Sequence, residues 1–145
     1  MVNQVILDEE ELQALREITA PPARRPVVLL VDDDRDVLAE MCELIEGAGI
    51  RCLTAGSAAE ALRRIHRDES DIDLLITDLR MEGEGSGLEL IRELNDIGTF
   101  LPIIVLSGQA DTRDVIEAMR LNVLDFMLKP VDPDYLLGAL RRNLG

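Results

Sequence analysis

The chain has very few aromatic residues and no long apolar run. Only 2% of its 145 residues are aromatic although 47% are hydrophobic, so any core must be aliphatic. No apolar stretch approaches the roughly 18 residues of a membrane span, and the N-terminus lacks the basic and apolar regions of a secretory signal. These absences favour one globular domain of ordinary size, with no membrane segment.

Cysteine is also scarce, since Cys42 and Cys52 are the whole complement. Their spacing is not that of a metal site, and their apolar sequence neighbours predict free, buried thiols. A reducing compartment, the cytoplasm, is therefore the expected location.

Positive charge is scarce as well. Acidic residues number 29 and basic residues 15, which gives a formal net charge of −14 and argues against direct binding of nucleic acid. The basic residues are all arginine except Lys129. A coding bias towards arginine explains that ratio, but against such a bias a single lysine suggests a position that needs a compact ammonium group.

Residues 1–26 differ from the rest of the chain. Four acids (8–11) precede apolar residues at helical spacing (12–18), and three prolines within 20–26 end any helix. We interpret 1–26 as an N-terminal extension made of a short acidic helix and a linker. A mostly disordered tail is the open alternative.

From Val27 onward, apolar β-type runs alternate with amphipathic segments, five times in succession. The expected strands are 27–31, 50–54, 72–77, 102–107 and 123–128. The expected helices are 34–48, 57–67, 88–97, 111–121 and 133–143. Near-continuous apolar strands joined by helices predict an α/β fold, with a parallel sheet covered on both faces.

Polar residues follow several of these strands, where functional groups of open α/β sheets gather. Asp32 to Asp34 follow the first strand, Asp78 the third, Ser107 ends the fourth, and Lys129 ends the fifth. Clustered carboxylates are unfavourable without a cation, and Mg²⁺ prefers such hard oxygen ligands. Asp32 to Asp34 alone would equally suit a solvated helix start; the full set favours a metal site.

The segments VLLVDDD, LLITDLRM, IIVLSG and DFMLKP resemble the signature segments of response regulator receiver domains. The resemblance covers about residues 27–143. It implies a doubly wound sheet of five parallel strands in the order 2-1-3-4-5, the flavodoxin and CheY order. It also implies a signalling module that catalyses only its own phosphorylation and dephosphorylation.

The resemblance implies that Asp78 is the phospho-acceptor. It implies that Asp32, Asp33, Asp78 and the backbone carbonyl of Arg80 hold Mg²⁺, or Mn²⁺ in its place. It further gives Arg80 and Gln109 a part in the lifetime of the phosphorylated form. Asp34, which the family pattern does not require, is expected to cap the following helix.

On the same basis, Ser107 and Lys129 bind the phosphoryl group. Ser107 and Phe126 occupy the switch positions, although an aromatic residue at 126 suits a core position in any case. The Lys129–Pro130 peptide bond is expected to be cis. His66 lies in a charged stretch and is expected at the surface, not as a catalytic base.

The loop after the acceptor departs from the family pattern. Met81 is present, but Glu82 stands where the family usually has proline. The matching glycine is Gly87, nine residues after the acceptor instead of eight, so the loop is one residue longer. Gly83 and Gly85 are expected to accommodate the extra residue.

Two other functions compete with this interpretation. A haloacid-dehalogenase-like phosphatase would use Asp32 as its nucleophile and Asp34 as the second acid of its motif. A degenerate receiver would serve only as a binding scaffold. Replacing Asp78 by asparagine separates the first interpretation from the phosphatase, because it removes only the receiver's acceptor.

The resemblance implies as partners a sensor histidine kinase or a histidine phosphotransfer protein. Downstream, it implies a protein target or a fused output domain. A homodimer through the fourth helix, fifth strand and fifth helix, or through residues 1–26, is a further expectation. The chain fits a stand-alone regulator or a receiver cut from a longer protein, and the short last helix favours the second slightly.

Overall fold

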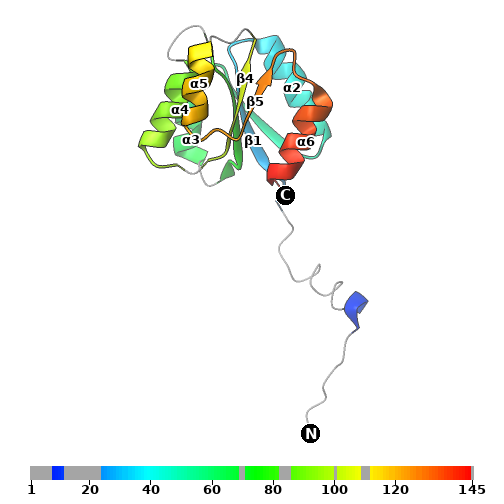
Figure 1. Cartoon of the computed structure of the whole chain (residues 1–145). Helices are drawn as coiled ribbons and strands as arrows, with labels where there is room; N and C mark the ends of the chain where they lie inside the picture. The colour runs from blue at the N-terminus through cyan, green and yellow to red at the C-terminus, as the bar shows by residue number, and fades with distance from the viewer. Residues whose placement is uncertain are drawn as a thin grey trace.

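A computed structural model describes residues 8–11, 24–68, 71–81, 86–99, 101–108 and 112–144 (Figure 1). Its centre is a sheet of five parallel strands in the order β2-β1-β3-β4-β5. The strands are β1 (Val27–Val31), β2 (Arg51–Ala55), β3 (Leu74–Asp78), β4 (Ile103–Ser107) and β5 (Asp125–Leu128). The predicted order is therefore confirmed.

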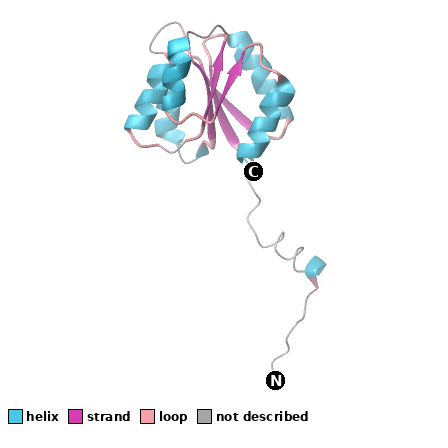
Figure 2. Cartoon of the chain, in the orientation of Figure 1, coloured by secondary structure: helices cyan, strands magenta, loops and turns pink. Residues whose placement is uncertain are grey.

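Helices cover both faces of the sheet (Figures 1 and 2). They are α2 (Arg35–Gly47), α3 (Ala58–Asp68), α4 (Gly87–Asp96), α5 (Thr112–Arg120) and α6 (Pro133–Leu144). Helices α2 and α6 lie on one face, and α3, α4 and α5 lie on the other. This arrangement confirms the doubly wound α/β fold.

The core is aliphatic, as the composition predicts. Successive residues of β1 point to opposite faces, so that Leu29 packs towards α3 and α4 while Leu30 packs towards α2 and α6. All five residues of β1 are buried, and so are those of β3 and β4. Burial on both faces explains why these strands read as continuous apolar runs.

Local signals place most helix ends as predicted. Asp34 caps α2, because its side chain accepts from the amides of Asp36 and Val37. Gly49 and Gly98 follow α2 and α4 with positive φ values of 84° and 76°. Ser57 precedes α3 and its hydroxyl accepts from the amide of Glu60, while the Glu60 carboxylate accepts from the amide of Gly56.

Some predicted features need correction. Strand β3 ends on Asp78 itself, one residue later than expected, because the ladder with β4 continues through Asp78 paired with Leu106. Strand β5 begins at Asp125 instead of 123. Cys52 is buried, but Cys42 of α2 is only partly buried.

Most of residues 1–26 lie outside the described residues. Residues 9–11 are helical, and residues 24–26 lead into β1. There the Arg24 guanidinium pairs with Asp73 at 2.8 Å, and the second carboxylate oxygen of Asp73 accepts from the Val27 amide at 2.8 Å. Within the described ranges, no helix has the length and apolar character needed to cross a membrane.

Candidate functional site

Four of the predicted polar side chains meet at the carboxyl edge of the sheet. Adjacent strands β1, β3 and β4 deliver Asp32, Asp78 and Ser107, and the end of β5 delivers Lys129. The three residues from β1, β3 and β4 are buried, with exposed fractions of 0%, 7% and 2%. Parallel strands bring these positions together because all their carboxyl ends lie at one edge.

Asp32 is held in place by the backbone on both sides. Its amide donates to the carbonyl of Ala55 at 3.1 Å, which continues the ladder between β1 and β2. Its Oδ1 accepts from the amide of Asp34 at 3.0 Å. Burial raises the pKa of Asp32 above its ordinary value, although the hydrogen bonds from Lys129 and Asp34 oppose the rise.

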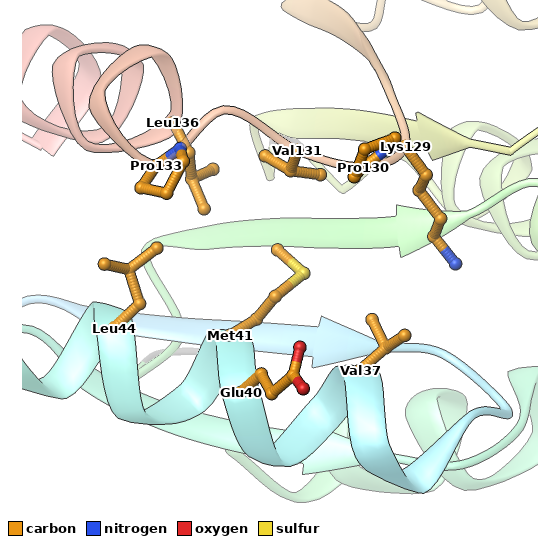
Figure 3. A pocket seen from close by; sticks show the side chains of 9 residues that line it. All are labelled: Val37, Glu40, Met41, Leu44, Lys129, Pro130, Val131, Pro133 and Leu136. Atoms are coloured by element: carbon orange, nitrogen blue, oxygen red, sulfur yellow. The ribbon is translucent and has the colours of Figure 1, made fainter.

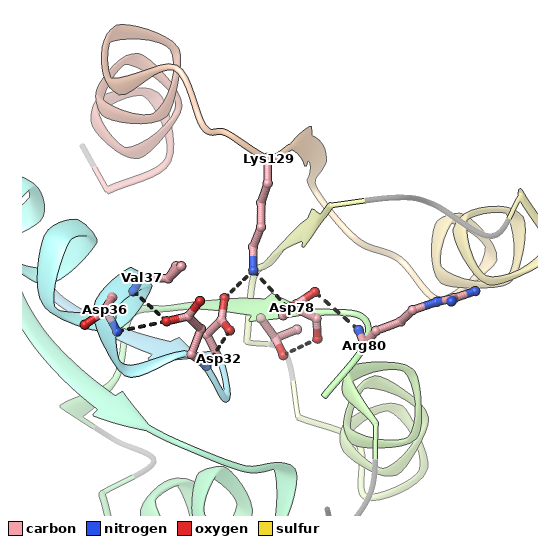
Figure 4. Close-up of polar contacts among 8 residues, drawn as sticks. Asp32, Asp36, Val37, Asp78, Arg80 and Lys129 are labelled. Atoms are coloured by element: carbon pink, nitrogen blue, oxygen red, sulfur yellow. Dashed lines mark hydrogen bonds and ion pairs between the residues drawn. The ribbon is translucent and has the colours of Figure 1, made fainter. Parts of the chain in front are cut away.

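Lys129 joins two carboxylates (Figure 4). Its Nζ donates to Oδ2 of Asp32 at 2.5 Å and to Oδ2 of Asp78 at 2.9 Å. Burial lowers the pKa of Lys129, but the hydrogen bonds to these two carboxylates outweigh burial and leave it above the ordinary value. The single lysine of the chain is therefore the cation of the acidic cluster.

The cluster also includes Asp33, which is exposed. One carboxylate oxygen from each of Asp32, Asp33 and Asp78 lies within 4.8 Å of the other two. Mg²⁺ prefers hard oxygen ligands of this kind, so these three carboxylates would suit such an ion. Three carboxylates and one ammonium leave an excess of negative charge that a divalent cation would offset.

The remaining predicted residues flank this cluster. Ser107 ends β4, and its carbonyl accepts from the amide of Lys129 at 2.8 Å. Phe126 is half-buried and packs against the core on the α3, α4 and α5 side. The Lys129–Pro130 peptide bond is cis. His66 is exposed, as predicted.

The acceptor loop is described at its two ends. Glu82, Gly83 and Gly85 lie outside the described residues, as does Gln109. Gly87, the first residue of α4, lies against the main chain of β3: a Cβ there would be 1.7 Å from the carbonyl oxygen of Asp78. Its amide donates to the carbonyl of Leu79 at 3.1 Å. This position therefore requires glycine, in agreement with its assignment as the glycine that closes the loop.

Arg80 connects the site to α5. Its amide donates to Oδ1 of Asp78 at 3.3 Å, and its side chain points away from that carboxylate (Figure 4). Its Nε lies 3.8 Å from Oδ2 of Asp114, near the start of α5. Residue spacing does not predict the contact of Asp114, because only the fold brings the first turn of α5 beside Arg80.

A cavity of about 620 Å³ opens next to the cluster (Figure 3). Val37, Met41 and Leu44 of α2 line one side, and the segment from Lys129 to Leu136 lines the other. Its walls are apolar apart from Lys129 and Glu40. Residue spacing does not predict this cavity, since it depends on the separation of α2 from the segment that leads into α6.

Comparison with known proteins gives a consistent result. A family model described as the response regulator receiver domain matches residues 28–141. The two-component response regulator PprB of Pseudomonas aeruginosa is 38% identical over 125 residues, which are 84% of this chain and 45% of that protein. The transcriptional regulatory protein FixJ of Azorhizobium caulinodans is 37% identical over 118 residues, 81% of this chain and 54% of that protein.

Solved structures agree. A response regulator receiver protein from Pseudomonas putida superposes with a TM-score of 0.76 at 40% identity, covering 83% of this chain and 98% of that one. A receiver domain from Clostridium thermocellum gives a TM-score of 0.76 at 31% identity, covering 81% and 93%. By contrast, the chain spans only about half the length of the curated relatives described above.

Proposed function

Because this chain belongs to the response regulator receiver domain family of two-component signalling, we propose that Asp78 accepts a phosphoryl group and thereby switches a protein-interaction surface. The observation that carries the proposal is the position of Lys129, whose ammonium group bridges Asp32 and Asp78 at the carboxyl edge. An ammonium group at that position pairs with a phosphoryl oxygen as readily as with a carboxylate.

The reaction is a displacement at phosphorus. An oxygen of the Asp78 carboxylate forms the new bond, and the bond between phosphorus and a histidine nitrogen of the donor breaks. The electron pair of that bond stays on the imidazole, which takes up a proton. A carboxylate is a weak nucleophile, so the reaction needs a good leaving group, and a phosphorylated histidine of a sensor kinase or phosphotransfer protein supplies it.

The residues around Asp78 orient and neutralise the reacting groups, which is most of what catalysis of phosphoryl transfer requires. Lys129 pairs with one phosphoryl oxygen, and the hydroxyl of Ser107 donates to another. Asp32, Asp33, Asp78 and the carbonyl of Arg80 would hold Mg²⁺. That ion supplies positive charge for the nucleophile and the phosphoryl oxygens.

The switch uses the surface formed by α5, β5 and α6. Drawing Ser107 towards the phosphoryl group shifts the end of β4, and Phe126 of β5 pairs with Val105 of that strand. Large apolar side chains are exposed on this surface: Ile116, Met119, Leu124, Leu128 and Tyr135. We propose that a second copy, a fused output domain or a downstream target binds there.

The donor protein must reach Asp78 from the carboxyl edge. The apolar cavity between α2 and the segment leading into α6 adjoins Lys129, so it offers the donor a surface next to the acceptor (Figure 3). We assign this receiver function to residues 27–145 and treat 1–26 as an extension. The free thiols of Cys42 and Cys52 suit the cytoplasm.

The phosphatase alternative needs Asp32 as its nucleophile. One feature weighs against it: Asp32 is fully buried. Asp78 keeps a small exposed fraction of 7%. We therefore propose no catalytic activity beyond phosphorylation and dephosphorylation of the chain itself.

Labelling with acetyl phosphate and Mg²⁺, read on a phosphate-affinity gel, tests the proposal. Wild type and the surface control Asp96→Asn should shift, and Asp78→Asn should not. Labelling of Asp78→Asn that is instead lost in Asp32→Asn would support the phosphatase. A wild-type chain that neither shifts nor responds to Mg²⁺ and beryllofluoride would identify a binding scaffold.

A further inference from the structure

Helix α5 is weakly anchored to the rest of the molecule. Of its described side chains, which are those of residues 113–120, Ala118 is the one that is buried. The neighbouring helix α4 has five buried residues. Elements with few buried apolar contacts have low local stability and move first when a protein switches.

Two ion pairs add to this limited packing. Glu117 of α5 pairs with Arg92 of α4, and Asp114 of α5 pairs with Arg80. The second pair joins α5 to the residue that lies two positions after Asp78. Since the Arg80 side chain is 61% exposed and Asp114 is 34% exposed, water screens this pair and another anion can displace it.

The backbone of Arg80 is already bound to the acceptor. Its amide donates to Oδ1 of Asp78, while its guanidinium is turned towards α5 (Figure 4). Rotation about the side-chain bonds is therefore enough to bring the guanidinium to a group attached at Asp78. A phosphoryl group there carries about two negative charges. Its oxygens can accept two parallel hydrogen bonds from the planar guanidinium group.

We propose that Arg80 exchanges Asp114 for the phosphoryl group, so that phosphorylation of Asp78 releases the first turn of α5. Asp114 is then a regulatory residue: it holds Arg80 away from the acceptor before phosphorylation and ties α5 to the acceptor loop. The inference rests on the proposed function of Asp78. It connects the site directly to the exposed side chains of Ile116 and Met119 on α5.

Calorimetric titration of the full chain with beryllofluoride and Mg²⁺ tests the exchange. Removing the competitor in Asp114→Asn should tighten beryllofluoride binding about two- to five-fold, the range expected for a screened ion pair. Arg80→Ala should weaken binding, and adding Asp114→Asn to Arg80→Ala should have no further effect. Glu117→Gln removes the same charge from the same helix away from Arg80, so its affinity should equal that of wild type.

Hydrogen exchange of the α5 amides provides the second measurement. Beryllofluoride should speed exchange in wild type, whereas Arg80→Ala should exchange fast with or without it. Equal affinities for wild type and Asp114→Asn, or the same gain in Glu117→Gln, would overturn the exchange and leave the proposed function intact. A wild-type chain that does not bind beryllofluoride would overturn both.

Discussion

The contact of Gly87 with the main chain of Asp78 makes a strong prediction about a single methyl group. In Gly87→Ala the new Cβ would lie 1.7 Å from the carbonyl oxygen of Asp78, where a separation of at least 3.0 Å is needed. It would also lie 2.7 Å from the carbonyl carbon. Both neighbours are backbone atoms of a central strand, so no side chain can turn aside to make room.

The required displacement is about 1.3 Å, shared between the start of α4 and the end of β3. Overpacking of this kind costs about 1–3 kcal/mol, and we expect the upper end because the backbone must move. With a urea dependence of about 2 kcal/mol per molar, the unfolding midpoint should fall by about 1–1.5 M.

The same displacement should impair function in the molecules that remain folded. A misplacement of about 1 Å at a reacting group can cost about a hundred-fold in rate. We therefore expect labelling of Gly87→Ala by acetyl phosphate to fall by one to two orders of magnitude under conditions where circular dichroism shows it folded.

Gly47→Ala is the matched control. It adds a methyl group to the last turn of α2, where nothing lies within 4 Å of the added carbon. It should leave labelling unchanged and should stabilise the chain by up to about 1 kcal/mol, because alanine favours a helix over glycine. Equal midpoints and equal labelling for wild type and Gly87→Ala would refute the close approach and the assignment of Gly87.

Three further predictions concern the acidic cluster, the cap of α2 and the contacts of Asp73. Mg²⁺ at about ten times its dissociation constant should raise the wild-type unfolding free energy by about 1.4 kcal/mol, and a chelator should reverse this rise. The unfolding free energy of Asp33→Asn should respond much less to Mg²⁺. Equal responses of the two proteins would remove Asp33 from the ligand set. Asp34→Ala should lose about 1 kcal/mol in urea unfolding because the amides of Asp36 and Val37 lose their acceptor, and an unchanged midpoint would deny the cap. Asp73→Ala should lower the free energy of unfolding by about 1–3 kcal/mol, because the Val27 amide is left unpaired. The Arg24 side chain is 52% exposed, so Arg24→Ala should lower it by less than about 1 kcal/mol. The reverse order would be inconsistent with these contacts.

Much of the fold follows from local pattern. Apolar runs such as Val27–Val31 are strands, and Asp34 and Gly49 mark helix ends through interactions with their own neighbours in sequence. The strand ends do not follow from local pattern, since the hydrogen bonds that extend β3 through Asp78 come from β4, about 28 residues further along the chain. Such pairing is absent from the local sequence.

The sequence by itself determined which side chains meet at the carboxyl edge, because in a parallel sheet every strand ends at that edge and Asp32, Asp78, Ser107 and Lys129 each lie at a strand end. Only the tertiary structure decided their contacts. The bridge by Lys129 joins residues 97 and 51 positions away, and the Arg80–Asp114 pair depends on where α5 lies beside β3. These distances are set by helix packing and side-chain rotamers, which residue spacing along the chain does not encode.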